Sequence, residues 1–151
     1  MIGPIEIATP ADMEALGRRL GGLLQPGDVV SLNGSLGAGK TLLVSGVAQA
    51  LGVEVQVTSP TFLVVRTYEG LLRLTHVDVY RLSTTAEFTD LELLEAAADG
   101  VLMIEWGDAV RGALPDDLLN IDITATVDGP RLVAIDGEGE WETRPLAELK
   151  P

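Results

Sequence analysis

The residues that point most clearly to chemistry form one octapeptide, Gly34 to Thr41, which reads GSLGAGKT. It matches the phosphate-binding pattern G-x-x-x-x-G-K-[ST] at every fixed position. The glycines of such a loop let backbone N–H groups close around phosphate oxygens at a helix N-terminus, where unpaired donors and the helix dipole favour anions. Lys40 would then reach the β- and γ-phosphates, and the Thr41 hydroxyl would bind Mg²⁺. The octapeptide therefore predicts nucleotide binding.

A second acid for the metal is expected at Glu105. This residue follows the continuous apolar run Val101–Ile104, which is typical of a buried parallel strand. P-loop proteins commonly take a metal-organising acid from the end of a strand beside the loop. We expect Glu105 to hold Mg²⁺ directly or through water, or to orient the attacking water; the sequence does not separate these roles. A solvated carboxylate at the end of a strand is the alternative.

A third acid, Asp78, lies in the β-rich run Leu71–Tyr80, on the face that also carries His76. A carboxylate buried without a partner is costly, so we expect Asp78 to contact His76, Arg81 or the water shell of the metal. His76 is the only histidine, which excludes a metal site built from several histidines. A structural role for His76 and a direct role in proton transfer both remain open.

Two further features have weaker signals. Ser59-Pro60-Thr61 follows the P-loop helix, and the proline favours an extended Ser59. The Thr61 hydroxyl is therefore a candidate sensor of the γ-phosphate, although an ordinary turn into a strand explains the segment nearly as well. Arg66, Arg73 and Arg81 are candidates for stabilising charge in the transition state, and no spacing rule selects one of them.

The elements that must position these residues can be placed from local patterns. Asp28–Leu32 is apolar enough for a buried strand that leads into the P-loop, and the helix after the loop is expected to run to Leu51. Thr9-Pro10-Ala11-Asp12 predicts an earlier helix start. A short edge strand is expected at Ile5–Ala8 before this helix.

Two hairpins and a short helical stripe complete the expected fold. The hairpins are Leu63–Tyr68 with Leu71–Tyr80, and Ile121–Val127 with Arg131–Ile135. Leu91, Leu94 and Ala98 are expected on the buried face of a short helix. Strands that alternate with helices predict an α/β fold of the P-loop NTPase type. We expect a mainly parallel central sheet with added antiparallel hairpins, flanked by helices.

Composition limits the possible partners and compartments. The chain has 151 residues, a formal net charge of −13 and no cysteine. This length predicts a single domain, with an acidic tail at about 137–151. A chain with this charge lacks the Lys/Arg-rich surface that binds a nucleic-acid backbone, so we expect it to reach any RNA through a protein partner. No apolar run approaches ~20 residues and the start lacks a signal-peptide pattern, so we expect a cytoplasmic protein without membrane contact.

Taken together, several segments resemble the TsaE family (older name YjeE), the bacterial ATPases of tRNA threonylcarbamoyladenosine (t6A) synthesis. The resemblance covers roughly Thr9 to Ile135. It rests on four blocks in the family's order and spacing, which are Gly34–Thr41, Ser59-Pro60-Thr61-Phe62, His76-Val77-Asp78-Val79-Tyr80-Arg81-Leu82 and Ile104-Glu105-Trp106. The third and fourth blocks, H-x-D-x-Y-R-L and I-E-W, are far more specific to the family than the P-loop alone.

The resemblance implies an ATP-binding protein with weak activity alone, which acts with TsaD and TsaB and reaches tRNA only through them. TsaC would supply the threonylcarbamoyl-adenylate that TsaD and TsaB use. By similarity, Thr41 and Glu105 bind Mg²⁺, Asp78 is needed for hydrolysis, and Ser59-Pro60-Thr61 is a switch. The catalytic residues implied are Lys40, Asp78, Glu105 and Thr61. The ATP contacts implied are Pro10, Leu36, Gly37, Ala38, Gly39, Lys40, Thr41, Asp108 and Arg131.

Departures from the family pattern and rival functions are also visible in the sequence. Asp90-Leu91-Glu92 stands where the family usually has Gly-Leu-Glu, and Gly107 replaces a common proline; both bear on loop geometry and partner contacts. One rival is a small-molecule kinase, which needs an acceptor pocket and commonly an arginine-rich lid. The other rival is a regulatory nucleotide-binding module without productive hydrolysis. After Glu105 the arginines are Arg111, Arg131 and Arg144.

Overall fold

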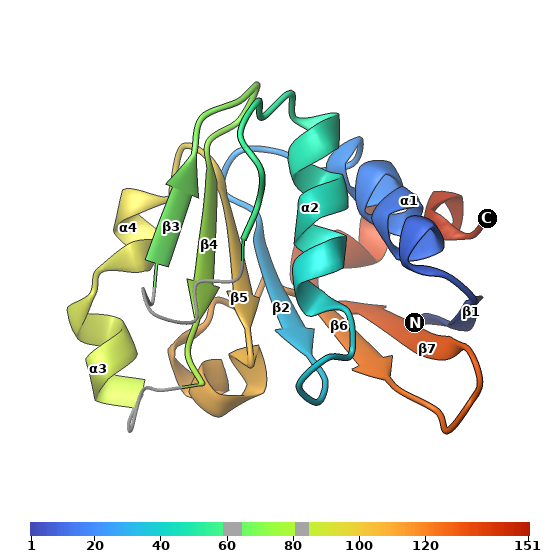
Figure 1. Cartoon of the computed structure of the whole chain (residues 1–151). Helices are drawn as coiled ribbons and strands as arrows, with labels where there is room; N and C mark the ends of the chain where they lie inside the picture. Colours follow the sequence, from blue (N-terminus) through green and yellow to red (C-terminus); the bar gives the residue numbers. More distant parts are fainter. Residues whose placement is uncertain (59–64, 81–84) are drawn as a thin grey trace.

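A single seven-stranded sheet organises the chain in a computed structural model that describes residues 1–58, 65–80 and 85–151 (Figure 1). The strand order is β1-β7-β6-β2-β5-β4-β3. The four central strands, β6, β2, β5 and β4, run parallel, whereas β3, β7 and β1 pair antiparallel at the two sides. The strands are β1 Ile2–Ile7, β2 Val29–Asn33, β3 Val65–Tyr68, β4 Leu74–Asp78, β5 Val101–Glu105, β6 Leu119–Thr124 and β7 Arg131–Gly137.

Helices cover both faces of this sheet. One hydrophobic cluster packs α1 and α2 on one face, and a second packs α3, α4 and η1 on the other (Figure 1). The helices are α1 Pro10–Gly21, α2 Lys40–Ala50, α3 Thr85–Asp90 and α4 Leu93–Ala96, with 3₁₀ helices η1 Gly107–Ala113, η2 Gly139–Thr143 and η3 Leu146–Leu149. The expected α/β fold with a mainly parallel centre is therefore confirmed. None of the helices in the described part of the chain is long and apolar enough to cross a membrane.

Helix α1 starts where its cap predicts and braces the P-loop helix. The Thr9 Oγ1 accepts a hydrogen bond from the Asp12 N–H at 3.1 Å, which satisfies one of the unpaired donors of the first turn. Where α1 crosses α2 the backbones nearly touch, because a Cβ on Gly46 would lie 2.1 Å from the Glu14 carbonyl oxygen. The close crossing holds the P-loop helix against α1.

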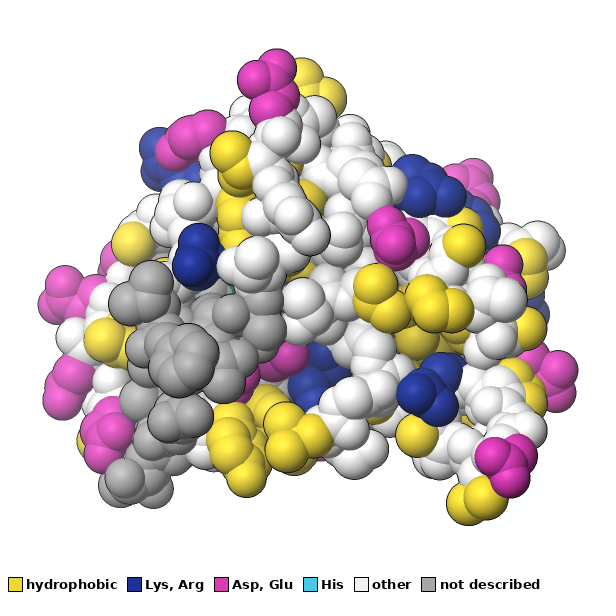
Figure 2. All heavy atoms as spheres, viewed as in Figure 1, with side chains coloured by type: hydrophobic (Ala, Val, Ile, Leu, Met, Phe, Trp, Pro, Cys, Tyr) yellow, Lys and Arg dark blue, Asp and Glu magenta, His cyan; other side chains and the backbone are white. Residues whose placement is uncertain are grey.

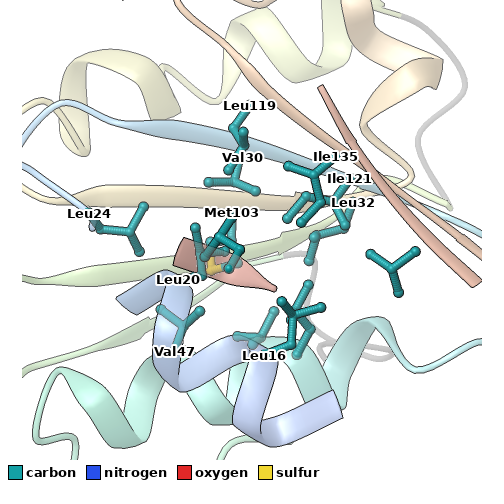
Figure 3. Close-up of a cluster of buried hydrophobic side chains, with 14 of the residues drawn as sticks. Leu16, Leu20, Leu24, Val30, Leu32, Val47, Met103, Leu119, Ile121 and Ile135 are labelled. Carbon is teal, nitrogen blue, oxygen red and sulfur yellow. The ribbon is translucent and has the colours of Figure 1, made fainter. Parts of the chain in front are cut away.

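The core beneath α1 and α2 is a layer of aliphatic side chains from helices and central strands. Figure 3 shows Leu16 and Leu20 of α1 and Val47 of α2 facing Val30, Leu32 and Met103 of the sheet. All of these side chains are buried. Because β2 and β5 are covered on both faces, their carboxyl ends are fixed at one edge of a rigid layer.

Two local predictions differ from the structure. The strand expected at Leu71–Tyr80 is shortened to Leu74–Asp78. At its amino end the Leu71 N–H donates to the Leu51 carbonyl oxygen at 2.7 Å, which ties Leu71 to the end of α2. The stripe expected at Leu91, Leu94 and Ala98 is wrong for Leu91 and Ala98, which are exposed, whereas Leu94 is partly buried against the second cluster. Glu92 has a left-handed backbone, with φ 52°, that separates α3 from α4 and shifts burial to Leu93 and Ala97.

The acidic segment 137–151 carries core residues that its charge conceals. Trp141 and Leu149 are buried in the main cluster. Arg144 lies over the Trp141 ring at 4.0 Å and makes a bidentate ion pair with the buried Asp28, at 2.5 and 2.7 Å. The segment is thereby joined to the residue that precedes β2.

Candidate nucleotide-binding site

The P-loop lies at the edge of the sheet where the parallel strands end. β2 ends at Asn33 and α2 begins at Lys40, so the loop spans the carboxyl end of β2 and the amino end of α2. Gly39 is the N-cap of α2 with φ 118°, a left-handed conformation that favours glycine, and no side chain caps the helix. The first N–H groups of α2 are thus available to a ligand, as a phosphate site requires.

A cavity of about 470 Å³ opens at this helix end. Figure 2 shows acidic, basic and hydrophobic side chains meeting below the amino end of α2. The cavity is lined by Leu36, Gly37, Ala38, Gly39, Lys40, Thr41 and Leu42 of the P-loop segment and by Asp78, Tyr80, Glu105 and Trp106. Both acids expected from the sequence therefore face the same space as the P-loop lysine and threonine.

Lys40 is held within the loop. Its Nζ donates to the carbonyl oxygens of Gly34 at 2.5 Å and Ser35 at 3.1 Å, and it lies 4.1 Å from the centroid of the Trp106 ring. Burial lowers the pKa of Lys40, while the charges of Glu105 and Asp78 raise it. The ring of Tyr80 packs against Trp106 with centroids 5.1 Å apart. An aromatic pair therefore supports the ammonium group by a cation–π contact.

Glu105 is the last residue of β5, between β2 and β4. Its Oε2 accepts a hydrogen bond from the Thr41 hydroxyl at 3.1 Å and lies 2.5 Å from Nε2 of His76. Asp78 stands directly opposite Glu105 in the β4–β5 pairing. Burial raises the pKa of Asp78, a hydrogen bond from the Tyr80 N–H lowers it, and the charge of Glu105 raises it further. Asp78 is thus a better proton acceptor than an exposed aspartate.

The donor set fits a Mg²⁺ ion that arrives with phosphate. Thr41 and Glu105 place a hydroxyl and a carboxylate side by side, and Mg²⁺ usually takes one or two protein oxygens plus phosphate and water. The described residues contain no cluster of three or more histidine, cysteine or acidic side chains that could hold a metal without such a ligand.

A second cavity, of about 190 Å³, lies on the other side of Gly37–Gly39. Pro10 and Arg131, both expected from the resemblance, line it together. The Arg131 side chain donates to the carbonyl oxygens of Ala38 and Gly37, each at 3.2 Å. Because a trans peptide is planar, turning the Ala38 carbonyl toward Arg131 directs the Gly39 N–H the opposite way. The sequence pattern alone did not indicate this brace.

Other candidates lie apart from the two cavities or outside the described residues. The Asp108 carboxylate is mostly exposed and lines neither cavity, although its N–H donates to the Asn33 side chain at 3.0 Å. Arg73 pairs with Glu69 and Asp99 at the amino end of β4, so it cannot serve a site at the carboxyl end. Ser59-Pro60-Thr61 and Arg81 lie outside the described residues.

Comparison with known proteins agrees with this geometry. Residues 7–133 match the family described as "Threonylcarbamoyl adenosine biosynthesis protein TsaE". The chain belongs to the TsaE family. Proteins named tRNA threonylcarbamoyladenosine biosynthesis protein TsaE are similar to it. The Streptomyces coelicolor protein is 43% identical over 91% of this chain and 99% of its own length. The Bacillus subtilis protein is 37% identical over 86% of this chain and 82% of its own.

A solved structure agrees as well. The crystal structure of Bacillus subtilis YdiB matches with a TM-score of 0.70 and 30% identity, over 91% of this chain and 86% of that one. Membership in the TsaE family indicates a nucleotide-binding P-loop protein. The departure from the TsaE pattern at Gly107 has a local reason, because a Cβ there would lie 2.0 Å from the Oγ of buried Ser31.

Proposed function

We propose that this chain binds ATP with Mg²⁺ and hydrolyses it in support of t6A modification of tRNA, acting with TsaD and TsaB. Lys40, Thr41, Asp78 and Glu105 carry the proposal because they converge on one cavity at the amino end of α2. Membership in the TsaE family supplies the pathway. With a net charge of −13, the chain is proposed to reach tRNA only through its partners.

The binding step uses charges and dipoles that are already in place. The N–H groups at the start of α2 receive phosphate oxygens, and Lys40 exchanges its contacts with the Gly34 and Ser35 carbonyls for the β- and γ-phosphates. Thr41 and Glu105 would hold a Mg²⁺ ion, which would neutralise charge on the phosphates. Pro10 and Arg131 line the neighbouring cavity, which we assign to the adenine side of the nucleotide.

In the hydrolytic step Asp78 accepts a proton from the attacking water. The water oxygen forms a bond to the γ-phosphorus while the bond to the β–γ bridging oxygen breaks, and the leaving oxygen keeps the electron pair. The raised pKa of Asp78 favours this transfer. The position of Asp78 opposite Glu105 places the base beside the metal-holding acid.

The arginines disfavour the kinase alternative. A kinase lid needs arginines that can close over phosphates, and three follow Glu105 in the sequence. In the structure Arg111 pairs with Glu138, Arg144 pairs with Asp28, and Arg131 holds P-loop carbonyls. Each is therefore engaged within the chain, and nothing among the described residues favours a lid.

Replacing Glu105 with alanine should remove most of the Mg²⁺ dependence of nucleotide binding. The variant loses a metal oxygen and the acceptor of Thr41, and we expect ATP affinity in Mg²⁺ to fall by at least the ~10–100-fold that is typical of losing a group that only orients a metal ligand. Titration with a fluorescent ATP analogue, in Mg²⁺ and in EDTA, measures this. Glu95→Ala on the surface of α4 is the control. Full Mg²⁺ dependence in Glu105→Ala would contradict the metal assignment.

Replacing Arg131 with alanine should weaken nucleotide binding roughly tenfold, because the P-loop carbonyls would lose two partly exposed hydrogen bonds and a loss of about 1.4 kcal/mol in binding free energy corresponds to a factor of ten. The same titration measures the loss. Arg131→Lys keeps the charge but cannot bridge both carbonyls with one planar group, so we expect only partial recovery. Complete recovery by lysine would show that charge, rather than the brace, is what matters.

A further inference from the structure

The imidazole of His76 is buried at a polar cost that packing does not explain. The residue is 0% exposed in β4. Its Nε2 contacts Glu105, but Nδ1 has no hydrogen-bond partner among the described residues. A buried polar atom without a partner is unfavourable. An aliphatic residue would fill the same position of a buried strand without that cost, so the Glu105 contact is the feature that distinguishes histidine here.

The contact with Glu105 is one-sided. Oε2 receives both the Thr41 hydroxyl, at 3.1 Å, and His76 Nε2, at 2.5 Å. Oε1 accepts no hydrogen bond from the residues that the structure describes. Because an ionised carboxylate only accepts hydrogen bonds, we assign Nε2 of His76 as the donor in this contact. Two donors on Oε2 restrict the rotation of the carboxylate, and Glu105 lines the nucleotide cavity, so Oε1 is the oxygen left for a ligand there.

We propose that His76 is a positioning residue for the nucleotide-bound Mg²⁺, which acts by holding Oε2 of Glu105 so that Oε1 is presented to the metal. The inference rests on the proposed function. Groups that hydrogen-bond a metal ligand orient it, and their loss typically weakens metal binding 10–100-fold. His76 does not touch the nucleotide in this account, and its role passes entirely through Glu105.

Two substitutions separate positioning from packing. His76→Gln keeps an N–H donor at the same number of bonds from Cβ as Nε2, whereas His76→Leu fills the space without a donor. Affinity for a fluorescent ATP analogue is measured for each protein in EDTA and across a Mg²⁺ titration, and thermal unfolding is followed without ligand. We expect the Mg²⁺ concentration that half-maximally raises nucleotide affinity to be about 10–100-fold higher for His76→Leu. For His76→Gln this concentration should remain within a few-fold of that for the unsubstituted protein.

The accompanying readouts make the result decisive. Affinity in EDTA should be equal in all three proteins, and their melting temperatures should stay close, because His76→Leu removes an unpartnered nitrogen while Oε2 of Glu105 keeps the Thr41 hydroxyl as a donor. If His76→Leu keeps its full response to Mg²⁺, the positioning role is overturned while the proposed function stands. The same holds if His76→Leu and His76→Gln lose the response to Mg²⁺ equally and both proteins are also less stable. If the unsubstituted protein itself shows no response to Mg²⁺, both are overturned.

Discussion

Replacement of Asp78 with asparagine is expected to lower ATP hydrolysis ~100-fold or more while ATP affinity changes by less than about threefold. General-base groups typically contribute 10²–10⁴-fold to a rate. Asparagine keeps an oxygen that can accept the Tyr80 N–H, which Asp78 binds at 2.8 Å, so the local backbone should be preserved. Single-turnover phosphate release and a parallel nucleotide titration measure the two effects.

A matched control is available for this prediction. Asp122→Asn removes an exposed carboxylate near the end of another parallel strand, β6, and should alter neither hydrolysis nor binding. Should Asp78→Asn weaken binding as strongly as it slows hydrolysis, the residue would be holding the metal or the phosphates rather than receiving a proton. The assignment of the base would then have to move elsewhere.

Replacement of Arg144 with alanine is expected to reduce the free energy of unfolding by about 3–5 kcal/mol, the range for removing one partner of a buried ion pair. Asp28, which is 6% exposed, would keep its charge and lose both contacts with the guanidinium. The stacking of Arg144 on Trp141 would be lost as well. Urea unfolding monitored by tryptophan fluorescence measures the change.

Two further variants test the cause of that loss. Arg18→Ala removes an arginine whose hydrogen bond to Gln49 is exposed, and it should cost less than about 1 kcal/mol. The double variant Asp28→Asn/Arg144→Met removes both charges and should recover much of the stability, since no lone buried charge remains. A loss in Arg144→Ala no larger than that in Arg18→Ala would show that the segment 137–151 does not stabilise the fold in this way.

Local signals predicted much of this structure because the information lay within a few residues. The P-loop between an apolar strand and a helix, the Thr9 cap, and the acid at the end of β5 all depend on contiguous patterns. Neighbouring parallel strands also end at one edge of a sheet, so Asp78 and Glu105 are both expected near the loop.

Contacts between distant segments were harder to predict. The brace from Arg131 to the P-loop joins residues 93 and 94 positions apart, and the bond from His76 to Glu105 depends on the register of two strands. The burial of Trp141 was not predicted because the few apolar residues of the acidic segment 137–151 show neither helical nor strand periodicity. The shift from Leu91 to Leu93 as a buried position followed from the left-handed backbone of Glu92, which no local pattern announces.

Steady-state phosphate release tests most directly the proposal that this chain is a P-loop ATPase that becomes productive in a larger assembly. The assay compares three samples. They are this chain alone, this chain with TsaB and TsaD, and the Asp78→Asn variant with TsaB and TsaD. The account predicts slow release alone, clear stimulation by the partners, and loss of that stimulation in the variant. Phosphate release that the partners leave unchanged, or ADP formation that requires a small-molecule acceptor, would contradict it.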